Sequence, residues 1–219
     1  MSLVSPEDQQ RLRDTFSAMT RPVRILFFTQ TIGCETCLQT REILDELPPL
    51  SDKISIEEIN LVLDRDRAAQ HGIERAPAIA LTYAADSNDG TFVDSRIRFL
   101  GLPSGYEFIT LVEAIRLVGG GESALSSENR ARMTAVDKAT TIQVFTTPSC
   151  PHCPRAVVLA YEMALANANV TAIGVEATEF PDLARRYMVT GVPKTIVNDT
   201  TEILGALPQD DFIDQALAG

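Results

Sequence analysis

All four cysteines of the 219-residue chain lie in two Cys-x-x-Cys pairs, Cys34–Cys37 and Cys150–Cys153. Cysteine reacts as its thiolate, and the pKa of the thiol falls at a helix N-terminus or inside such a pair. In both pairs the first cysteine stands between a predicted strand and a predicted helix, where the helix dipole would stabilise the sulfur anion. We therefore predict that Cys34 and Cys150 attack a partner's disulfide and that Cys37 and Cys153 resolve the mixed disulfide.

Each pair is followed at the same interval by a proline that opens an apolar run. Pro77 lies 40 positions after Cys37, and Pro193 lies 40 positions after Cys153. A single shift of 116 residues superimposes both cysteine pairs and both prolines. A period of this size in a chain of this length indicates two similar units.

The two prolines complete the predicted sites if the Ala76–Pro77 and Val192–Pro193 peptide bonds are cis, a geometry that proteins use almost only before proline. The backbone of Ala76 and of Val192 would then be exposed beside the cysteines. An exposed backbone segment can pair with an extended peptide by strand addition. We therefore predict Ala76 and Val192 as substrate-binding residues.

The residues between and beside the cysteines predict a difference between the two sites. His152 can donate to the Cys150 thiolate or carry positive charge near it, which stabilises the reduced form and makes that disulfide the more oxidising one. Glu35 places a negative charge beside Cys34 and acts in the opposite sense. The first pair is therefore predicted to have the lower reduction potential.

Two further charged residues have a functional and an ordinary interpretation. Glu176 follows a predicted strand that faces the helix carrying Cys153, so it is either a buried proton acceptor for Cys153 or an exposed carboxylate at a strand end. The shift of 116 residues places Asn60 at the same position in the first unit. Lys194 follows Pro193 and either steers acidic substrates or is an ordinary surface lysine.

The apolar patterns predict an α/β protein in which the same order of elements occurs twice. Asp86–Gly90 predicts a turn that joins the strand at Pro77 to a strand over residues 96–100. Gly119–Gly121 is the clearest linker and divides the chain into predicted domains 1–119 and 120–219. Strands are expected over residues 23–29, 54–59, 142–145, 170–175 and 202–204 and from each proline, and helices over 37–47, 64–71, 108–117, 127–137, 156–166, 181–187 and 209–217.

The composition argues against two classes of partner. The net charge is −11 and no basic arm or patch stands out, so neither nucleic acid nor an anionic membrane surface is expected. No stretch reaches the roughly 18 apolar residues of a membrane span. Met1–Asp8 has neither the basic start nor the apolar core of a signal peptide. We therefore expect a cytoplasmic protein, in which Cys-x-x-Cys pairs are typically catalytic or metal-binding.

A zinc site with four thiolate ligands is the main alternative for the cysteines. Against it, 112 residues separate Cys37 from Cys150, far more than the roughly 15–20 of a ribbon-type zinc site. The repeated proline also contributes nothing to zinc binding. We predict no bound metal, and no bound cofactor, because the sequence contains no nucleotide-binding fingerprint.

With these residues in view, the chain resembles the glutaredoxin-like protein disulfide oxidoreductases of thermophilic archaea and bacteria, which are similar to protein disulfide isomerase. The resemblance covers nearly the whole chain, and one departure is that Cys34-Glu35-Thr36-Cys37 has neither a proline nor an aromatic residue between its cysteines. It rests most specifically on Arg75–Ala78, Phe99–Phe108, Thr147–Pro154, Val175–Ala177 and Val192–Lys194.

The resemblance implies two tandem thioredoxin-like units, each with a central mixed sheet flanked by helices. It implies a thiol–disulfide oxidoreductase that reduces, oxidises or isomerises disulfides in protein substrates. It also implies that a thioredoxin reductase-like flavoprotein recharges the chain, so that NADPH and FAD would belong to that partner.

Two functions from different classes remain open. The first is an enzyme that exchanges disulfides in proteins through two active pairs. The second is an electron-relay module that passes reducing equivalents from a reductase to a peroxidase-like partner through one active pair. Loss of one pair or of one proline would have favoured the relay, and neither is lost.

Overall fold

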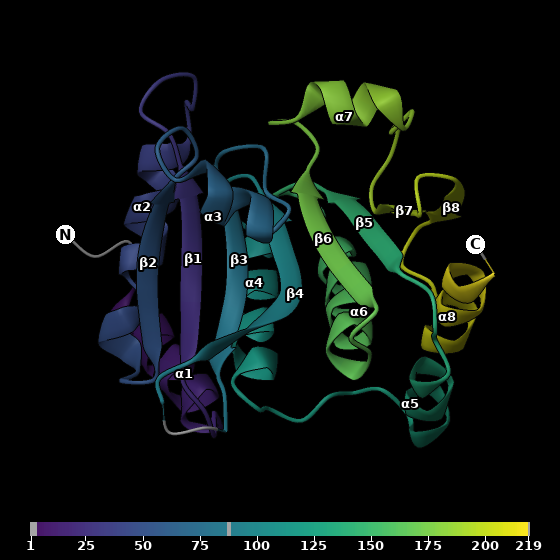
Figure 1. Cartoon of the computed structure of the whole chain (residues 1–219), viewed down its shortest axis with the longest axis horizontal. Coiled ribbons are helices and arrows are strands. Elements are labelled where there is room, and N and C mark those ends of the chain that lie inside the picture. Colours follow the sequence, from purple (N-terminus) through teal and green to yellow (C-terminus); the bar gives the residue numbers. More distant parts are fainter. Residues whose placement is uncertain (1–3, 87–88, 219) are drawn as a thin grey trace. The chain divides into compact units, whose positions relative to one another are not determined.

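The computed structural model describes residues 4–86 and 89–218, which form two compact units (Figure 1). Unit 1 comprises the described residues up to Ser95, with Leu100–Leu102 and Val112–Glu122. Unit 2 comprises Arg96–Phe99, Pro103–Leu111 and the described residues from Ser123 onward. The domain boundary between residues 119 and 120 stays a prediction, and residues 87 and 88 of the predicted turn lie outside the described residues.

In unit 1, strand β1 lies between a parallel and an antiparallel neighbour. β1 pairs with β2 so that Val23 lies opposite Ile54, and with β3 so that Phe28 lies opposite Ala78. Strand β4 (Phe92–Leu100) and helix α4 (Tyr106–Val118) contribute residues to both units. The other elements of unit 1 are α1 (Pro6–Ser17), β1 (Val23–Thr29), α2 (Cys37–Asp45), the short 3₁₀ helix η1 (Pro48–Leu50), β2 (Ile54–Asn60), α3 (Arg65–Gln70) and β3 (Ala78–Ala84).

Unit 2 repeats this arrangement. β5 pairs in parallel with β6, where Thr146 lies opposite Glu176, and antiparallel with β7, where Phe145 lies opposite Lys194. β8 pairs with the other edge of β7. The elements are α5 (Ser127–Thr134), β5 (Thr140–Thr146), α6 (Cys153–Ala166), β6 (Val170–Glu176), α7 (Pro181–Arg186), β7 (Lys194–Val197), β8 (Thr201–Leu204) and α8 (Gln209–Leu217). The repeated pairing confirms the predicted α/β fold with two similar units.

Two helices begin at a serine that caps them. The Ser5 hydroxyl accepts a hydrogen bond from the Asp8 N–H (3.1 Å) at the start of α1, and Ser126 does the same for Asn129 (3.1 Å) at the start of α5. Within the described ranges, no helix is both long enough and apolar enough to cross a membrane.

The repeat contains one offset that the sequence spacing did not show. β1 begins at Val23 and β5 begins at Thr140, which is an interval of 117 residues, whereas the cysteines repeat at 116. The loop from β1 to Cys34 is therefore one residue longer than the loop from β5 to Cys150. Gly33 takes a left-handed conformation (φ 76°) in this longer loop, which glycine tolerates without a Cβ clash.

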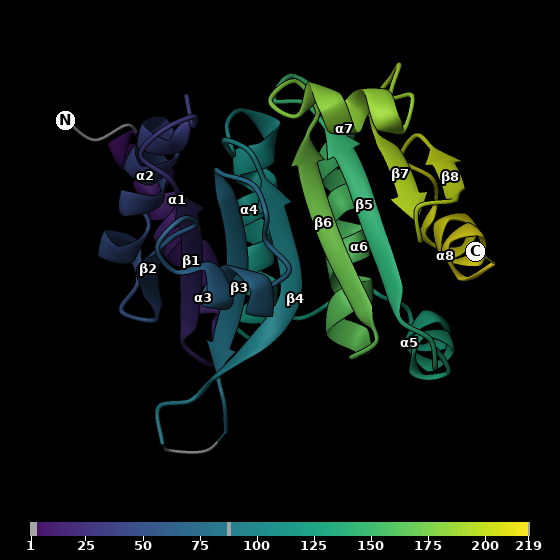
Figure 2. The same cartoon turned by 45° about the horizontal axis from the view of Figure 1, so that its top comes forward.

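Each unit has its own core. In unit 2, Tyr161 is fully buried on α6 and its hydroxyl donates to the Arg98 carbonyl at 2.8 Å. Figures 1 and 2 both show α6 lying along one face of β5 and β6, with α7 beyond the carboxyl ends of these strands. In unit 1 a buried cluster under α3 consists of Leu26, Phe28, Ile59, Ala68, Ile73, Ala78 and Ala80.

The glycines expected to form a linker are packed within unit 1. The Gly119 carbonyl accepts from the Thr20 N–H (2.8 Å) and the Arg21 N–H (3.1 Å). A Cβ at Gly119 would lie 2.6 Å from the Met19 side chain. Glycine suits these positions because the chain passes close to Met19–Arg21. The predicted linker therefore begins packed against unit 1, and unit 2 resumes at Ser123.

We expect Gly174→Ala to destabilise the protein by about 1–3 kcal/mol, because its methyl group would overpack the core between β6 and α6. A Cβ at Gly174 would lie 2.7 Å from a ring carbon of Phe99 and 2.9 Å from the Tyr161 hydroxyl oxygen. The midpoint of urea unfolding measures the loss. Gly191→Ala is the matched control, since a Cβ there meets nothing within 4 Å. Equal midpoints for the two variants would contradict the packing described for unit 2.

Candidate active site at two disulfide pairs

The second cysteine pair lies between the end of β5 and the start of α6. Cys150 and Cys153 form a disulfide with their Cα atoms 5.5 Å apart, and α6 begins at Cys153. Cys150 is 8% exposed and Cys153 is 1% exposed. An incoming thiolate can therefore reach Cys150 more readily, which suits the predicted order of attack. His152 is exposed and stands at the N-cap of α6.

The backbone before the second proline lies beside the disulfide. The Val192–Pro193 bond is cis, as predicted, and the Val192 carbonyl oxygen lies 3.8 Å from the Cys150 sulfur. β7 begins at Lys194, directly after Pro193, and runs antiparallel to β5. The antiparallel pairing therefore brings Val192 to the end of β5 that leads to Cys150.

A surface groove of about 580 Å³ runs along this backbone. Two apolar side chains stand exposed on it, because Met188 is 69% exposed and Leu204 is 66% exposed. Exposed apolar side chains around a groove favour contact with apolar groups of a partner. The groove is lined by Met188, Thr190, Gly191, Val192, Pro193, Lys194, Glu202, Leu204 and Gly205.

Lys194 is buried, so the interpretation of an ordinary surface lysine is wrong. Only 4% of the residue is exposed, and its ammonium group donates to the carbonyls of Tyr187 (2.7 Å) and Met188 (3.3 Å). The same group lies 3.0 Å from the Glu202 carboxylate. A buried ammonium needs such partners, and these tie the loop after α7 to β8 instead of leaving the charge free to steer substrates.

Glu176 is buried, with 1% of the residue exposed, so the interpretation as an exposed carboxylate at a strand end is wrong. Its carboxylate accepts hydrogen bonds from the Thr178 N–H (3.1 Å), the Thr178 hydroxyl (2.7 Å) and the Glu179 N–H (2.6 Å). Glu176 is therefore a buried acid whose carboxyl oxygens are held by the turn that follows β6, and its role as proton acceptor for Cys153 stays a prediction.

Glu107 is a buried acid to which the sequence assigned no role. It is 2% exposed, and neither carboxylate oxygen makes a well-formed hydrogen bond. Burial and the nearby charge of Glu176 raise the pKa of Glu107 to about 9. A lone acid in the otherwise apolar first turn of α4, between Tyr106 and Phe108, was the signal that could have identified it.

The first pair has the same placement in unit 1. Cys34 and Cys37 form a disulfide with their Cα atoms 5.5 Å apart, and α2 begins at Cys37. Cys37 is 7% exposed and Cys34 is partly exposed. The Ala76–Pro77 bond is cis, as predicted, and the Pro77 carbonyl accepts from the Gly101 N–H at 3.0 Å.

Exposed apolar residues lie close to the first pair in the sequence and in the loop after β2. Ile32 is 88% exposed just before Cys34, and Leu38 is 72% exposed just after Cys37. Leu63 is 81% exposed in the loop after β2, where the Asn60 side chain accepts from its N–H at 3.1 Å. Asn60, which is the residue of unit 1 equivalent to Glu176, therefore holds a loop by hydrogen bonding and carries no charge.

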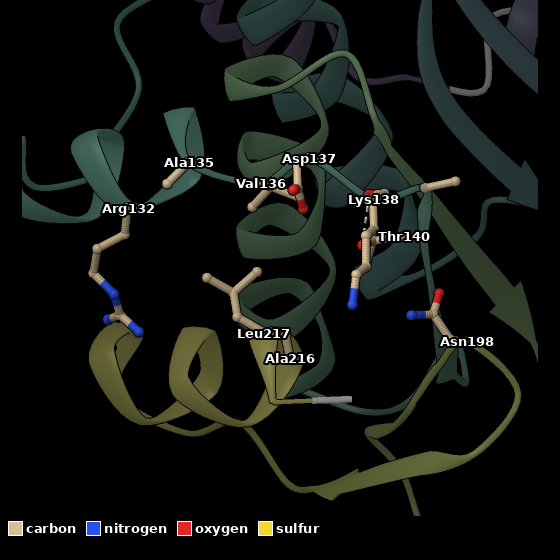
Figure 3. A pocket seen from close by; sticks show the side chains of 10 residues that line it. Arg132, Ala135, Val136, Asp137, Lys138, Thr140, Asn198, Ala216 and Leu217 are labelled. Atoms are coloured by element: carbon tan, nitrogen blue, oxygen red, sulfur yellow. Dashed lines mark hydrogen bonds between the residues drawn. The ribbon is translucent and has the colours of Figure 1, made fainter.

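A second cavity in unit 2 lies away from the cysteines. It measures about 300 Å³ and is formed by the ends of α5 and α8, the start of β5 and Asn198 (Figure 3). The cavity includes Thr140, the first residue of β5, whereas Cys150 follows the last one. Seven strand residues span roughly 20 Å, so this cavity is separate from the disulfide site.

The sulfurs are arranged as two separate bonds. Each sulfur is bonded within its own pair, whereas the zinc alternative requires four thiolates on one ion. Among the described residues, no group of three or more His, Cys, Asp or Glu side chains is placed to hold a metal. The chemistry available at both pairs is therefore dithiol–disulfide exchange.

Comparison with known proteins supports the same chemistry. Residues 140–218 match the family model described as a thioredoxin domain. The thioredoxin of Methanocaldococcus jannaschii is 34% identical over 76 residues, which cover 33% of this chain and 87% of that protein. The alkyl hydroperoxide reductase component AhpF of Xanthomonas campestris pv. phaseoli is 28% identical over 183 residues, or 82% of this chain. The match spans only 30% of the length of that relative.

Two solved structures resemble nearly the whole chain. A protein disulfide oxidoreductase from Aeropyrum pernix is 29% identical with a TM-score of 0.86, over 97% of this chain and 91% of that one. The NTD_N/C domain of the alkylhydroperoxide reductase AhpF from Enterococcus faecalis is 27% identical with a TM-score of 0.88, over 97% of this chain and 99% of that one. The chain therefore belongs to the thioredoxin family, as a thiol–disulfide oxidoreductase with two tandem units that each carry a Cys-x-x-Cys disulfide.

Proposed function

We propose that this chain exchanges disulfides with protein substrates and acts as a reductase and isomerase through both Cys-x-x-Cys pairs. The observation that supports this proposal best is the groove beside Cys150, where Val192 lies 3.8 Å from the sulfur and Met188 and Leu204 stand exposed. A small-molecule disulfide needs no such surface. An extended polypeptide can fill it by pairing with the Val192 backbone and placing an apolar side chain between Met188 and Leu204.

In the reductive direction the cycle starts from the reduced pair. The Cys150 thiolate attacks a substrate disulfide, forms a new S–S bond and releases one substrate sulfur as a thiolate. Cys153 then attacks Cys150, which releases the second substrate sulfur and closes the enzyme disulfide. Two electrons pass from the enzyme dithiol to the substrate, and the reverse steps oxidise a substrate dithiol. Isomerisation results when a second substrate thiolate attacks the substrate sulfur of the mixed disulfide and releases Cys150 as a thiolate before Cys153 attacks.

The remaining predicted site residues have supporting roles in this proposal. His152 stabilises the Cys150 thiolate from the start of α6, and Pro193 and Pro77 shape the backbone beside each pair. Glu176, together with Glu107, takes part in the proton transfers of Cys153. Ala76 provides the equivalent of Val192 at the first pair.

The partner that recharges the chain is proposed to be a flavoprotein that draws electrons from NADPH. The alkyl hydroperoxide reductase component AhpF of Xanthomonas campestris, which is more than three times the length of the matched segment, supports a reductase partner. The same relative favours a second candidate function, in which one pair relays electrons towards a peroxidase-like protein. The cytoplasmic location stays a prediction.

We expect Cys150→Ser to lower both insulin reduction and refolding of scrambled ribonuclease at least about tenfold, because the attacking thiolate at the groove is lost. Cys34→Ser should retain most of the isomerase activity. Full activity of Cys150→Ser in both assays, with loss in Cys34→Ser, would place substrate exchange at the first pair.

We expect Leu204→Glu to lower kcat/KM for insulin about tenfold, since one buried apolar contact is worth roughly 1.5 kcal/mol. The charged side chain would replace the apolar rim of the groove. Val93→Glu is the matched control, because Val93 is an exposed strand residue that does not line the groove. If both variants reduced insulin at the wild-type rate, the groove would have no role in substrate binding.

We expect the first pair to have the lower reduction potential, because Glu35 destabilises a thiolate at Cys34 whereas His152 stabilises one at Cys150. Redox titration against dithiothreitol measures each pair alone, with the other pair changed to serine. His152→Ala should lower the potential of the second pair by about 10–20 mV. A higher potential at the first pair would show that other groups dominate.

A further inference from the structure

Helices α3 and α7 are equivalent in the two units, because the shift of 116 residues maps one onto the other. At the end of α3 the Gly72 N–H donates to the Ala69 carbonyl at 3.0 Å. The Ile73 N–H donates to the Ala68 carbonyl, also at 3.0 Å. These two hydrogen bonds form a Schellman ending, in which the residue after the cap takes a left-handed conformation and is usually glycine. Gly72 fits this rule with a φ of 65°.

Helix α7 ends with the same two hydrogen bonds, but a methionine stands in place of the glycine. The Met188 N–H donates to the Arg185 carbonyl at 3.1 Å, and the Val189 N–H donates to the Ala184 carbonyl at 2.8 Å. Met188 has a φ of 49°, a conformation that is costly for a residue with a Cβ. Strained residues of this kind are concentrated at functional sites. Met188 is therefore a candidate for a role that its equivalent in unit 1 does not have.

Met188 lies on the groove beside the second disulfide. It is 69% exposed and lines the groove together with Val192, whose carbonyl lies 3.8 Å from the Cys150 sulfur. The Met188 carbonyl accepts a hydrogen bond from the Lys194 ammonium at 3.3 Å. In Figure 2 the chain passes from the end of α7 to β7, with β8 beside it. Hydrogen bonds to α7 and to β7 thus hold the backbone of Met188 at the groove.

Met188 also carries an accessible sulfur atom. The other methionines of the described residues are buried, because Met19 is 2% exposed and Met133 and Met163 are 0% exposed. In the oxidised chain every cysteine sulfur belongs to a disulfide, so no thiol is available to an oxidant. Within the part of the chain that the structure describes, Met188 is therefore the one exposed thioether that a hydroperoxide meets.

We propose that Met188 is an oxidation site that controls the binding of polypeptides at the second pair. As a thioether it forms an apolar part of the groove, and as a sulfoxide it weakens the binding of an apolar polypeptide segment. The first pair does not respond in this way, because Gly72 stands at the equivalent position. This inference rests on the proposed exchange of disulfides with polypeptides and adds a means of regulating it.

The oxidation step transfers one oxygen atom from a hydroperoxide to the Met188 sulfur. The O–O bond breaks, an S–O bond forms, and the hydroperoxide leaves as an alcohol, or as water when it is hydrogen peroxide. The sulfur loses two electrons, which the hydroperoxide accepts. A methionine sulfoxide reductase reverses the change with two electrons and two protons, and the oxygen leaves as water. The modification can therefore act as a reversible switch.

The effect on binding follows from the polarity of the product. A sulfoxide turns a flexible apolar side chain into a polar one. Its oxygen is hydrated in the open groove, and an apolar side chain placed between Met188 and Leu204 would have to displace that water without replacing its hydrogen bond. The dissociation constant should rise about fivefold, which corresponds to the loss of part of one apolar contact. The fold should persist, because Met188 is exposed.

The first test locates the oxidised sulfur in the full chain with both disulfides formed. Hydrogen peroxide is the oxidant, and mass spectrometry follows tryptic peptides, which carry each methionine separately. We expect the peptide of residues 187–194 to gain one oxygen at least about tenfold faster than the peptides of Met19, Met133 and Met163. Met1 lies outside the described residues and is followed on its own peptide. Oxidation of the buried methionines at the same rate as Met188 would overturn the inference.

The second test measures polypeptide binding without disulfide exchange. Carboxymethylated insulin B chain has no thiol, and fluorescence anisotropy gives its dissociation constant with the oxidised full chain. Peroxide should raise this constant about fivefold, and methionine sulfoxide reductase should restore it. Met188→Leu is the matched control, because it keeps an apolar side chain without a thioether, and its dissociation constant should not respond to peroxide. Met188→Gln should bind as weakly as the peroxide-treated wild-type chain.

The outcomes separate this inference from the proposed function. No binding by the untreated chain, an unchanged dissociation constant once Met188 is oxidised, or an equal response in Met188→Leu would overturn the inference. Circular dichroism of the treated wild-type chain shows whether its fold persists, so these measurements do not depend on the folding of a variant. If oxidation weakens B-chain binding as expected but the untreated chain reduces no insulin, the proposed function alone is contradicted.

Insulin reduction by each pair alone provides a third readout. In the chain with Cys34→Ser and Cys37→Ser, peroxide treatment of the oxidised form should lower kcat/KM for insulin about fivefold. Reduction of 2-hydroxyethyl disulfide by the same protein should continue at the untreated rate, because so small a disulfide does not need the groove. The chain with Cys150→Ser and Cys153→Ser should show no response to peroxide in either assay. An equal loss for both substrates would place the damage at the cysteines and overturn the inference.

Discussion

The chemistry of each unit depends on the pairing of one central strand with a parallel neighbour on one side and an antiparallel neighbour on the other. In unit 2 the parallel partner β6 ends beside the end of β5, which places Glu176 opposite Thr146. The antiparallel partner β7 begins there, which brings Val192 to Cys150. Strand pairing thus brings the Cys150 sulfur, the Val192 carbonyl and the Glu176 carboxyl group, which are distant in the sequence, to the same end of β5.

Much of this arrangement was predictable because the signals were local. The β-branched and aromatic run from Val23 to Thr29 is bounded by turn residues, and the observed strand has the predicted bounds. The cysteines lie at strand-to-helix junctions, and both bonds before the repeated prolines are cis, as predicted. These features could be predicted in both units because the constant spacing of cysteines and prolines reflects a repeated fold. A repeat within one sequence therefore replaced much of the information that an alignment would supply.

The features that the sequence did not reveal depend on contacts between distant residues. Glu107 is buried because α4 starts against Pro148, and its apolar sequence neighbours indicate burial but not which segment covers it. Gly119 resembled a linker residue, yet it packs against a segment about 100 positions earlier. The spacing of the cysteines does not show the extra residue in the loop before Cys34, because the shift of 116 residues aligns the cysteines with each other. The strand pairing shows that β1 and β5 are offset by one further residue.

Lys194 gives the groove at the second site a fixed shape. Its ammonium holds two carbonyls of the loop after α7 and a carboxylate of β8, so the opposite walls of the groove are fastened together before any polypeptide arrives. Ordering a loop on binding costs conformational entropy, and a wall that is already fixed avoids much of that cost. In the proposed exchange with polypeptides, such a groove would accept the segments that fit its surface as it stands.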